Sequence, residues 1–498
     1  MRTEKFSHLL LTYFRLMRKS FLQVASIAFI GGLVGRGLRY FLNVIIARSL
    51  GPEALGVFAF GIVVMKASAV AARVGLNNAA QKFIPIYLME DDDSKLLGTV
   101  ILCLIIPLIL GVILAIIIYV AEGYVNRITG ESFTSVTQVF LLGIPMFAVM
   151  TVGMSATKGF QETKYAVLIR DLGQSGLAVL MAVIGGYVFA DIRVIVLGYL
   201  GSLLFGILLV VLSLWRQGGI QWIRPEFEGR RLIMYATPLT IVAITQYFIS
   251  WTDILMLGFL VPASELGWYQ AAFQTSVMLT IVLNAANSIF PALTSDLHSR
   301  GQHERLRRIH DVVTKWVTYL TVLGAVFILF YAGDILTLFG ASTPEARISL
   351  RILAIGQAIV AVTGPVGFLL LMTGYERLDA ANTVIVAFTN VILNYFLIRQ
   401  FGVVGAALAT SSALALLNLL RLGEVWWSLN QNPFGRNYWK GLLAILFAST
   451  VMWFGQLLPV FPILRVLLIG TISFFVFCIT MSILQLDEND TLLINSLQ

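Results

Sequence analysis

Long apolar stretches are the feature that most constrains what this chain can fold into. Runs of about twenty or more mostly apolar residues recur along its whole length of 498 residues. A helix of about 20 residues crosses the roughly 30 Å hydrocarbon core of a bilayer. Charged residues make up only 12% of the chain, about half of their usual share in soluble domains. The sequence therefore predicts an all-α polytopic membrane protein.

We expect about fourteen transmembrane helices, in two six-helix lobes followed by two further helices. Lysine and arginine gather in the N-terminal arm and in the even-numbered connections, which predicts a cell-membrane protein with both termini in the cytoplasm. The expected segments are a basic cytoplasmic arm over 1–22, an N-lobe with helices one to six over 23–215, a cytoplasmic linker over 216–231, a C-lobe with helices seven to twelve over 232–427, and the last two helices with a cytoplasmic C-terminus over 428–498.

An internal repeat supports this division. The stretch "NVIIARSLGPEALGVFAF" (43–60) aligns with "DILMLGFLVPASELGWYQAA" (253–272), with a short insertion, and "LNNAAQKFIPIY" (76–87) aligns with "LNAANSIFPALT" (283–294). Six spans per lobe make the two copies run in the same direction, related by an axis along the membrane normal. In transporters built from such repeats, the substrate binds where the repeats meet.

Charged residues inside the predicted spans are the main functional signal. Arg36, Arg39 and Asn43 share one helix face by their spacing, and Lys66 and Arg73 share a face of the predicted span 54–80. A cation at the bilayer centre costs about 2.5–3.5 kcal/mol. Arg36 lies roughly 15 Å from the nearer helix end, too far for its side chain to reach the interface. We therefore interpret the arginines as facing a water-filled cavity.

Fixed cations in a cavity favour an anionic ligand, and the arginine fork suits phosphate. The candidate phosphate-binding residues are Arg36, Arg39, Lys66 and Arg73. The candidate polar or coupling residues of the cavity are Asn43, Gln246, Asp253 and Gln274. This pattern indicates a phosphate-bearing amphiphile with a polar, sugar-like head group.

Some of these charged residues also have purely structural explanations. Arg73 and Arg170 lie near enough to a span end to snorkel or to pair locally, and Asp171 is a natural partner for Arg170. Asp253 is either a coupling group or the partner of a salt bridge to Arg36 or Arg39.

Other functional classes find little support in the residues. The two cysteines, Cys103 and Cys478, lie in apolar spans, so we expect neither a disulfide framework nor a metal site. No Walker loop or Ser/His/Asp set is visible, and we expect no cofactor and no enzymatic activity. The net charge of +8 follows from loop topology rather than from nucleic-acid binding.

Several stretches resemble the polysaccharide-exporter and oligosaccharide-flippase branch of the multidrug/oligosaccharidyl-lipid/polysaccharide flippase superfamily. They are "ARSLGPEALGVFAF", "NNAAQKFIPIY", "DILMLGFLVPASELGWYQAA", "NSIFPAL", "LMTGYERLDAANTVIVAFTNVILNYFLI" and "FGVVGAALAT". The resemblance implies a flippase that moves a lipid-(pyro)phosphate-linked oligosaccharide across the membrane by alternating access, with membrane lipids and glycan-assembly enzymes as partners. It also implies a cavity role for Arg36 and Arg39, whereas Arg48, which matches by position but lies in the turn near the outer surface, has either a cavity role or an interfacial anchoring role.

Two other functions are alternatives to a flippase. A multidrug or cation antiporter of the same superfamily is the nearer one, although a cationic substrate would call for acidic residues in the cavity. A polytopic glycosyltransferase or polymerase is the second, although the outer connections are short and their carboxylates are scattered.

Overall fold

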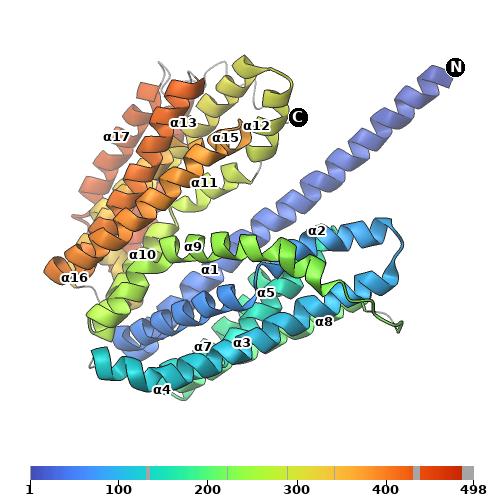
Figure 1. Ribbon diagram of the computed structural model, residues 1–498. Coiled ribbons are helices and arrows are strands. Elements are labelled where there is room, and N and C mark those ends of the chain that lie inside the picture. The colour runs from blue at the N-terminus through green and yellow to red at the C-terminus, as the bar shows by residue number, and fades with distance from the viewer. Residues whose placement is uncertain are drawn as a thin grey trace. The chain divides into compact units, whose positions relative to one another are not determined.

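The computed structural model describes residues 2–129, 135–220, 222–288, 290–340, 343–429 and 438–484. Within these ranges, side chains are described except at 2–29, 122–129, 135, 163, 249 and 292. The side chains of the predicted basic arm over 1–22, and the C-terminal residues beyond 484, therefore lie outside the description. All regular elements in the described ranges are helices, which confirms the predicted all-α membrane fold (Figure 1).

Ten helices in the described ranges are long and apolar enough to cross a membrane, or eleven if the bent helix α9 (Gly229–Leu260) counts as one span. Three of the ten belong to helices with a backbone break: α1 (Arg2–Ala72) at Gly51, α13 (His303–Leu336) at Tyr331 and α16 (Glu376–Leu429) at Gly402. Both glycines have a positive φ, the region that favours glycine. Because α1 and α16 each cover two predicted spans, the count of fourteen stays a prediction.

The chain divides into two compact units, one of residues 1–50 and 57–251 and the other of residues 51–56 and 252–498. The chain passes between the units at 50–51, at 56–57 and finally inside α9 at 251–252, whereas the sequence places the lobe boundary in the linker over 216–231. The reason is visible in unit 1, the unit that contains residues 57–251. There Tyr247 of α9 donates a hydrogen bond to the carbonyl of Val63 over 3.0 Å, so the first part of α9 packs with the N-terminal helices.

The predicted linker is itself attached to unit 1. The backbone N–H of Glu226 donates to the carbonyl of Ser94 over 2.9 Å, and a Cβ added at Gly98 would collide with the Glu226 carbonyl. Tyr87 donates its hydroxyl to Glu228 Oε2 over 2.6 Å. The segment that follows helix α8 is therefore held against α2 and α3.

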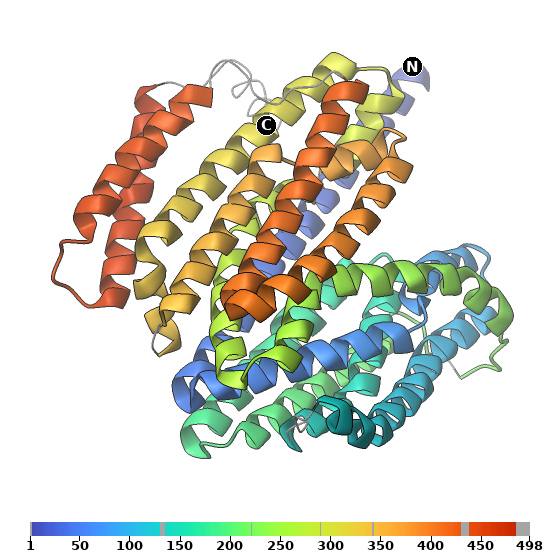
Figure 2. The same ribbon diagram turned by 60° about the vertical axis from the view of Figure 1, so that its left-hand side comes forward.

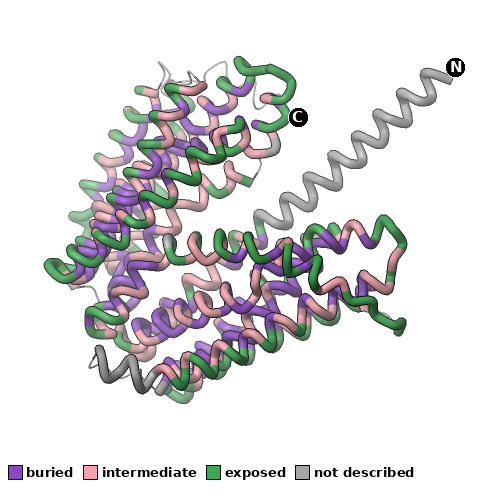
Figure 3. The backbone as a smooth tube through the Cα atoms, viewed as in Figure 1, coloured by how far each residue is buried: buried purple, intermediate pink, exposed green. Residues whose placement is uncertain are grey.

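Unit 1 has a small aromatic core. The ring of Phe58 lies 5.6 Å from that of Phe140 and 5.7 Å from that of Tyr199. Helix α3 exposes large apolar side chains between Ile105 and Val120, as expected of a helix in contact with lipid. The tube in Figure 3 is coloured by the burial of each residue. Besides α1 and the first part of α9, the helices of this unit are α2 (Leu76–Met89), α3 (Asp93–Thr129), α4 (Ser135–Leu141), α5 (Gly143–Gly159), α6 (Thr163–Val167), α7 (Ser175–Val183) and α8 (Ile192–Arg216), with π-helical segments at Leu168–Gln174 and Ile184–Val188.

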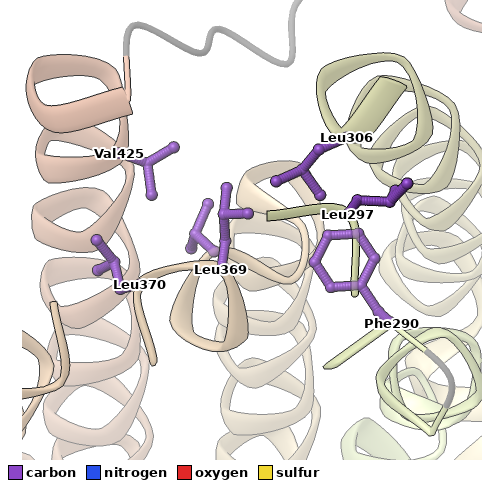
Figure 4. Close-up of a cluster of buried hydrophobic side chains, with 7 residues drawn as sticks. Phe290, Leu297, Leu306, Leu369, Leu370 and Val425 are labelled. Carbon is purple, nitrogen blue, oxygen red and sulfur yellow. The ribbon is translucent and has the colours of Figure 1, made fainter. Parts of the chain in front are cut away.

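Unit 2, which contains residues 252–498, packs its short helices on long ones. Its apolar cluster consists of Phe290, Leu297, Leu306, Val366, Leu369, Leu370 and Val425 (Figure 4). The last two helices lie side by side (Figure 2). Besides α16 and the end of α9, the helices of this unit are α10 (Ala263–Val277), α11 (Thr280–Asn287), α12 (Phe290–Ser299), α13 (His303–Leu336), α14 (Pro344–Thr363), α15 (Val366–Met372), α17 (Tyr438–Gly455) and α18 (Pro462–Ile483), with a 3₁₀ turn at Thr337–Phe339.

Two glycines at equivalent positions of the predicted repeat touch each other. Gly56 ends "LGPEALG" and Gly267 ends "VPASELG". A Cβ added at Gly56 would meet the carbonyl of Ala263, and one added at Gly267 would meet the carbonyl of Pro52. The two turns therefore approach backbone to backbone, which only glycine permits.

Candidate functional site

Arg39, one of the predicted cavity arginines, is anchored by a buried carboxylate. Arg39 donates from Nη1 to Asp171 Oδ1 over 3.0 Å and to Ser175 Oγ over 3.3 Å. The side chain of Asp171 is 3% exposed, whereas that of Arg39 is 35% exposed. The carboxylate thus lies behind the guanidinium group, which remains accessible on its other side.

A π-helical segment presents this carboxylate. Residues Leu168–Gln174 form one wide turn between α6 and α7, a local feature that is frequent at functional sites. Within it, Arg170 donates from Nε to Asp171 Oδ1 over 3.1 Å, and Ser175 donates its hydroxyl to the Arg170 carbonyl over 2.9 Å. The local pairing expected from the sequence between Arg170 and Asp171 is present, and Arg39 joins it.

Two lysines complete this group. Lys66 lies over the ring of Phe147, with 5.5 Å between Nζ and the ring centroid, and interacts electrostatically with Arg39 and Arg170. Lys158, at the end of α5, interacts with Arg170 and Asp171. We call Arg39, Lys66, Lys158, Arg170 and Asp171 the Arg39 cluster. The cluster contains four cations and one carboxylate, and Lys66 belongs to it through the two arginines.

Arg36 and Asn43 lie on the same helix as Arg39. Asn43 is buried and donates from Nδ2 to the carbonyl of Arg39 over 2.7 Å, so its amide braces the helix backbone at the site. Arg36 is half-buried. Among the described side chains of unit 1, no carboxylate forms an ion pair with Arg36, which leaves its charge uncompensated within that unit.

Arg73 directly follows the end of α1, inside the predicted span 54–80. The predicted span 54–80 is broken between Arg73 and the start of α2, where Val74 (φ 43°) and Gly75 (φ 66°) are left-handed. Arg73 lies at this break, two helical turns or about 10 Å along the axis from Lys66. Its Nε is buried without a hydrogen-bond partner among the described residues. The structure therefore brings Arg39 and Lys66 together but leaves Arg73 outside their cluster.

The remaining candidates divide between the units. Gln246 is an exposed residue of α9 in unit 1, next to Tyr247, whose ring stacks on Trp251 at 6.1 Å. Gln274 is half-buried on α10 in unit 2. Within unit 1, no described contact joins Gln246 to the Arg39 cluster.

Asp253 is buried in unit 2 and held by hydroxyl groups. Its carboxylate accepts hydrogen bonds from the hydroxyl of Tyr269 and, over 3.3 Å, from that of Thr410, and also from the backbone N–H of Ile254. Within unit 1, the carboxylate that pairs with Arg39 is Asp171.

Sequence reasoning singled out Arg170 and Asp171 only as a local pair and left Lys158 and Ser175 out of the site. The available signal was the adjacent Arg and Asp in "LIRDLGQSG" (168–176), because two opposite charges inside an apolar span seldom occur without a function.

The chain matches two family models. The model described as "Polysaccharide biosynthesis protein" matches residues 21–296, and the MatE model matches residues 238–396. The first match covers more than half of the chain. The chain belongs to the polysaccharide biosynthesis protein family. The superfamily membership expected from the sequence motifs is thereby confirmed.

Relatives of this family member include two proteins of Haloferax volcanii. The chain is 29% identical over 402 residues to the probable low-salt glycan biosynthesis flippase Agl15, covering 79% of this chain and 80% of the relative. It is 32% identical over 177 residues to the probable flippase AglR, covering 34% of this chain and 37% of the relative.

Solved structures share the fold of this family member. The lipid II flippase MurJ in an inward closed conformation superposes with a TM-score of 0.70 at 16% identity, covering 91% of this chain and 98% of MurJ. An inward-facing multidrug resistance MATE family transporter superposes with a TM-score of 0.67 at 15% identity, covering 79% of this chain and 94% of the transporter. The multi-pass helical architecture is that of these transporters.

Proposed function

We propose that the protein is a flippase that moves a lipid-(pyro)phosphate-linked oligosaccharide across the cell membrane, in surface polysaccharide or glycan assembly. The observation that carries this proposal is the excess of cations in the Arg39 cluster, within helices that are otherwise apolar. Such an excess is costly in a membrane unless an anion binds there. A phosphate or pyrophosphate group supplies that anion.

In this account Arg36, Arg39 and Lys66 bind the phosphate, and Arg73 meets it from the helix break. Arginine offers a planar fork of donors to phosphate oxygens, and lysine adds a point charge. Asn43, Gln246 and Gln274 present amides, which suit the hydroxyl groups of a glycan. Asp253 takes no part in binding the phosphate, because a carboxylate repels it, and acts as a coupling group.

The transport step is alternating access between two lobes. The lobes open toward the cytoplasm, the phosphate binds to the cations, and the glycan occupies the polar space while the lipid tail stays in the bilayer. Keeping the tail in the bilayer avoids transferring many apolar carbons into water, at about 0.8 kcal/mol for each CH₂. The two lobes then rock against each other, and this motion opens the site to the other side of the membrane.

Both termini lie in the cytoplasm in this proposal, and the glycan is received from enzymes that assemble it there. The protein itself transports and catalyses no covalent step. Agl15 and MurJ are both named as flippases. The similarity of this chain to both proteins supports a transport function.

A multidrug or cation antiporter is the alternative, and the MatE match and the MATE fold both fit it. The Arg39 cluster argues for an anionic substrate, because a cationic drug would be repelled by the excess of positive charge.

The test is reconstitution of the full chain into liposomes, with two transport measurements on the same preparation. One measures transbilayer movement of a fluorescent polyprenyl-pyrophosphate oligosaccharide, and the other measures efflux of a cationic dye. Movement of the glycolipid without dye efflux supports the flippase. Dye efflux without glycolipid movement contradicts it and favours the antiporter.

A further inference from the structure

We infer that Asp171 is a positioning residue of the phosphate site: it holds Arg39 and Arg170 in place while the site is empty and yields them to the phosphate of the incoming lipid. This inference rests on the proposed function. It assigns to a single buried acid the tuning of how tightly the flippase holds its substrate.

The first support is the geometry of the hydrogen bonds. Oδ1 of Asp171 accepts from Arg39 Nη1 over 3.0 Å and from Arg170 Nε over 3.1 Å. Arg170 Nη2 reaches Asp171 Oδ2 over 3.4 Å. One carboxylate therefore fixes two guanidinium groups that come from distant parts of the chain.

The second support is the set of donors that remain. The hydrogen bonds that Arg39 makes to described side chains all use Nη1. Its Nε and Nη2, which together form the bidentate fork used for phosphate, are left for a ligand. Because the Asp171 side chain is 3% exposed and that of Arg39 is 35% exposed, a ligand reaches the arginine from the side opposite to the acid.

The third support is the balance of charge. The Arg39 cluster contains four cations and one carboxylate, so Asp171 compensates only part of their charge. A pyrophosphate carries more negative charge and more acceptor oxygens than a carboxylate. It can therefore take over hydrogen bonds from Asp171, and the acid in turn speeds release by reclaiming them.

Replacing the acid by its amide separates its charge from its shape. Asp171→Asn keeps a carbonyl oxygen that accepts from Arg39, but it removes the charge that competes with the ligand. A hydrogen bond to a charged group contributes enough to change affinity about tenfold or more. We therefore expect Asp171→Asn to bind a pyrophosphate lipid about tenfold more tightly, with a lower KM and a lower kcat because release becomes slower.

The experiment measures the affinity of the purified full chain in nanodiscs for a polyprenyl pyrophosphate without glycan, together with KM and kcat of flipping in liposomes. The variants are Asp171→Asn and Arg39→Ala. The matched control is Asp379→Asn, which weakens the ion pair between Asp379 and Arg421 (2.6 Å) in unit 2 and should leave affinity, KM and kcat unchanged. A residue that served only the fold would lower the amount of active protein without tightening binding.

The outcomes separate the two proposals. If Arg39→Ala binds the lipid as well as the wild type does, the phosphate site of the proposed function is wrong. If Arg39→Ala weakens binding but folded Asp171→Asn binds no more tightly than the wild type, only the role of Asp171 is wrong. Should Asp171→Asn not fold, Asp171→Glu decides: it keeps the competing charge and should bind no more tightly than the wild type, and tighter binding would overturn the inference.

Discussion

Gly35 of α1 lies directly against Asp171, 136 positions later in the chain. A Cβ added at Gly35 would come within 2.6 Å of Asp171 Oδ1 and within 2.9 Å of its Cα. Real Cβ atoms do not approach so closely, and a backbone atom cannot give way as a flexible side-chain end would. The absence of a side chain at position 35 is thus what lets Asp171 reach Arg39.

Gly35→Ala should therefore disturb the Arg39 cluster. We expect a loss of about 1–3 kcal/mol in the free energy of unfolding, the usual cost of overpacking, and slower glycolipid flipping. Gly37→Ala is the control, because a Cβ there meets nothing within 4 Å. Thermal unfolding in detergent and flipping in liposomes measure both effects. Equal behaviour of the two variants would contradict the proposed contact.

The contact between Gly56 and Gly267 makes a second prediction. Either glycine replaced by alanine would place a Cβ on a backbone carbonyl of the opposite turn, so Gly56→Ala and Gly267→Ala should each lower the melting temperature and the yield of folded protein. Because both changes separate the same two turns, the fall in melting temperature of the double variant should be smaller than the sum of the falls in the two single variants. Additive losses would mean that the two sites are independent.

A third prediction concerns the segment after α8. Tyr87→Phe removes the hydrogen bond to Glu228 Oε2 and should cost about 1 kcal/mol of unfolding free energy at neutral pH. Tyr119→Phe, at a side chain that is 60% exposed, should cost nothing measurable. Melting temperatures of both variants check this, and an unchanged melting temperature of Tyr87→Phe would contradict it.

The same hydrogen bond predicts a pH dependence. The Tyr87 hydroxyl and then the Arg231 guanidinium hold the pKa of Glu228 below its ordinary value. A lowered carboxyl pKa gives stability that is present above the unfolded-state pKa and is lost as the pH falls through the folded-state pKa. The difference in melting temperature between wild type and Tyr87→Phe should therefore be full at pH 7 and shrink below about pH 4. A difference that grows on acidification would contradict this assignment.

A fourth prediction concerns Asp253, which two hydroxyl groups hold in unit 2. If it couples transport to an ion or to the membrane potential, Asp253→Asn should still equilibrate glycolipid between leaflets but lose its response to an imposed gradient. Tyr269→Phe keeps the carboxylate and should keep the response. Flipping measured with and without a gradient tests this, and a response that survives in Asp253→Asn would remove Asp253 from the coupling step.

The helical architecture could be predicted from the sequence because only α-helices and closed β-barrels can span a bilayer. Apolar length predicts helices, and the break at Gly51 is readable from the Gly-Pro pair that follows Leu50. The break at Val74 and Gly75 was not readable, since a β-branched residue disfavours a positive φ. It forms where Gly75 packs against the carbonyl of Ala236, a contact between distant residues that no local pattern reveals.

The site was predictable only in part, for a similar reason. Helical spacing put Arg39 and Asn43 on one face, and the Asn43 amide does donate to the Arg39 carbonyl. The pairing of Arg39 with Asp171 depends on packing across 132 positions, and the wide π-helical turn that presents Asp171 has no recognisable sequence signature. Whether Arg36 and Arg73 bind the same ligand as Arg39 stays a prediction.

Transbilayer movement of a polyprenyl-pyrophosphate oligosaccharide by Arg36→Ala/Arg39→Ala shows whether these two arginines hold the phosphate. The control variant, Arg193→Ala/Arg399→Ala, removes two cations outside the Arg39 cluster. We predict that the wild type and the control move the lipid and that Arg36→Ala/Arg39→Ala, folded and reconstituted equally well, does not. If that variant moves the lipid as fast as the wild type, the arginines do not hold the phosphate and the account is wrong.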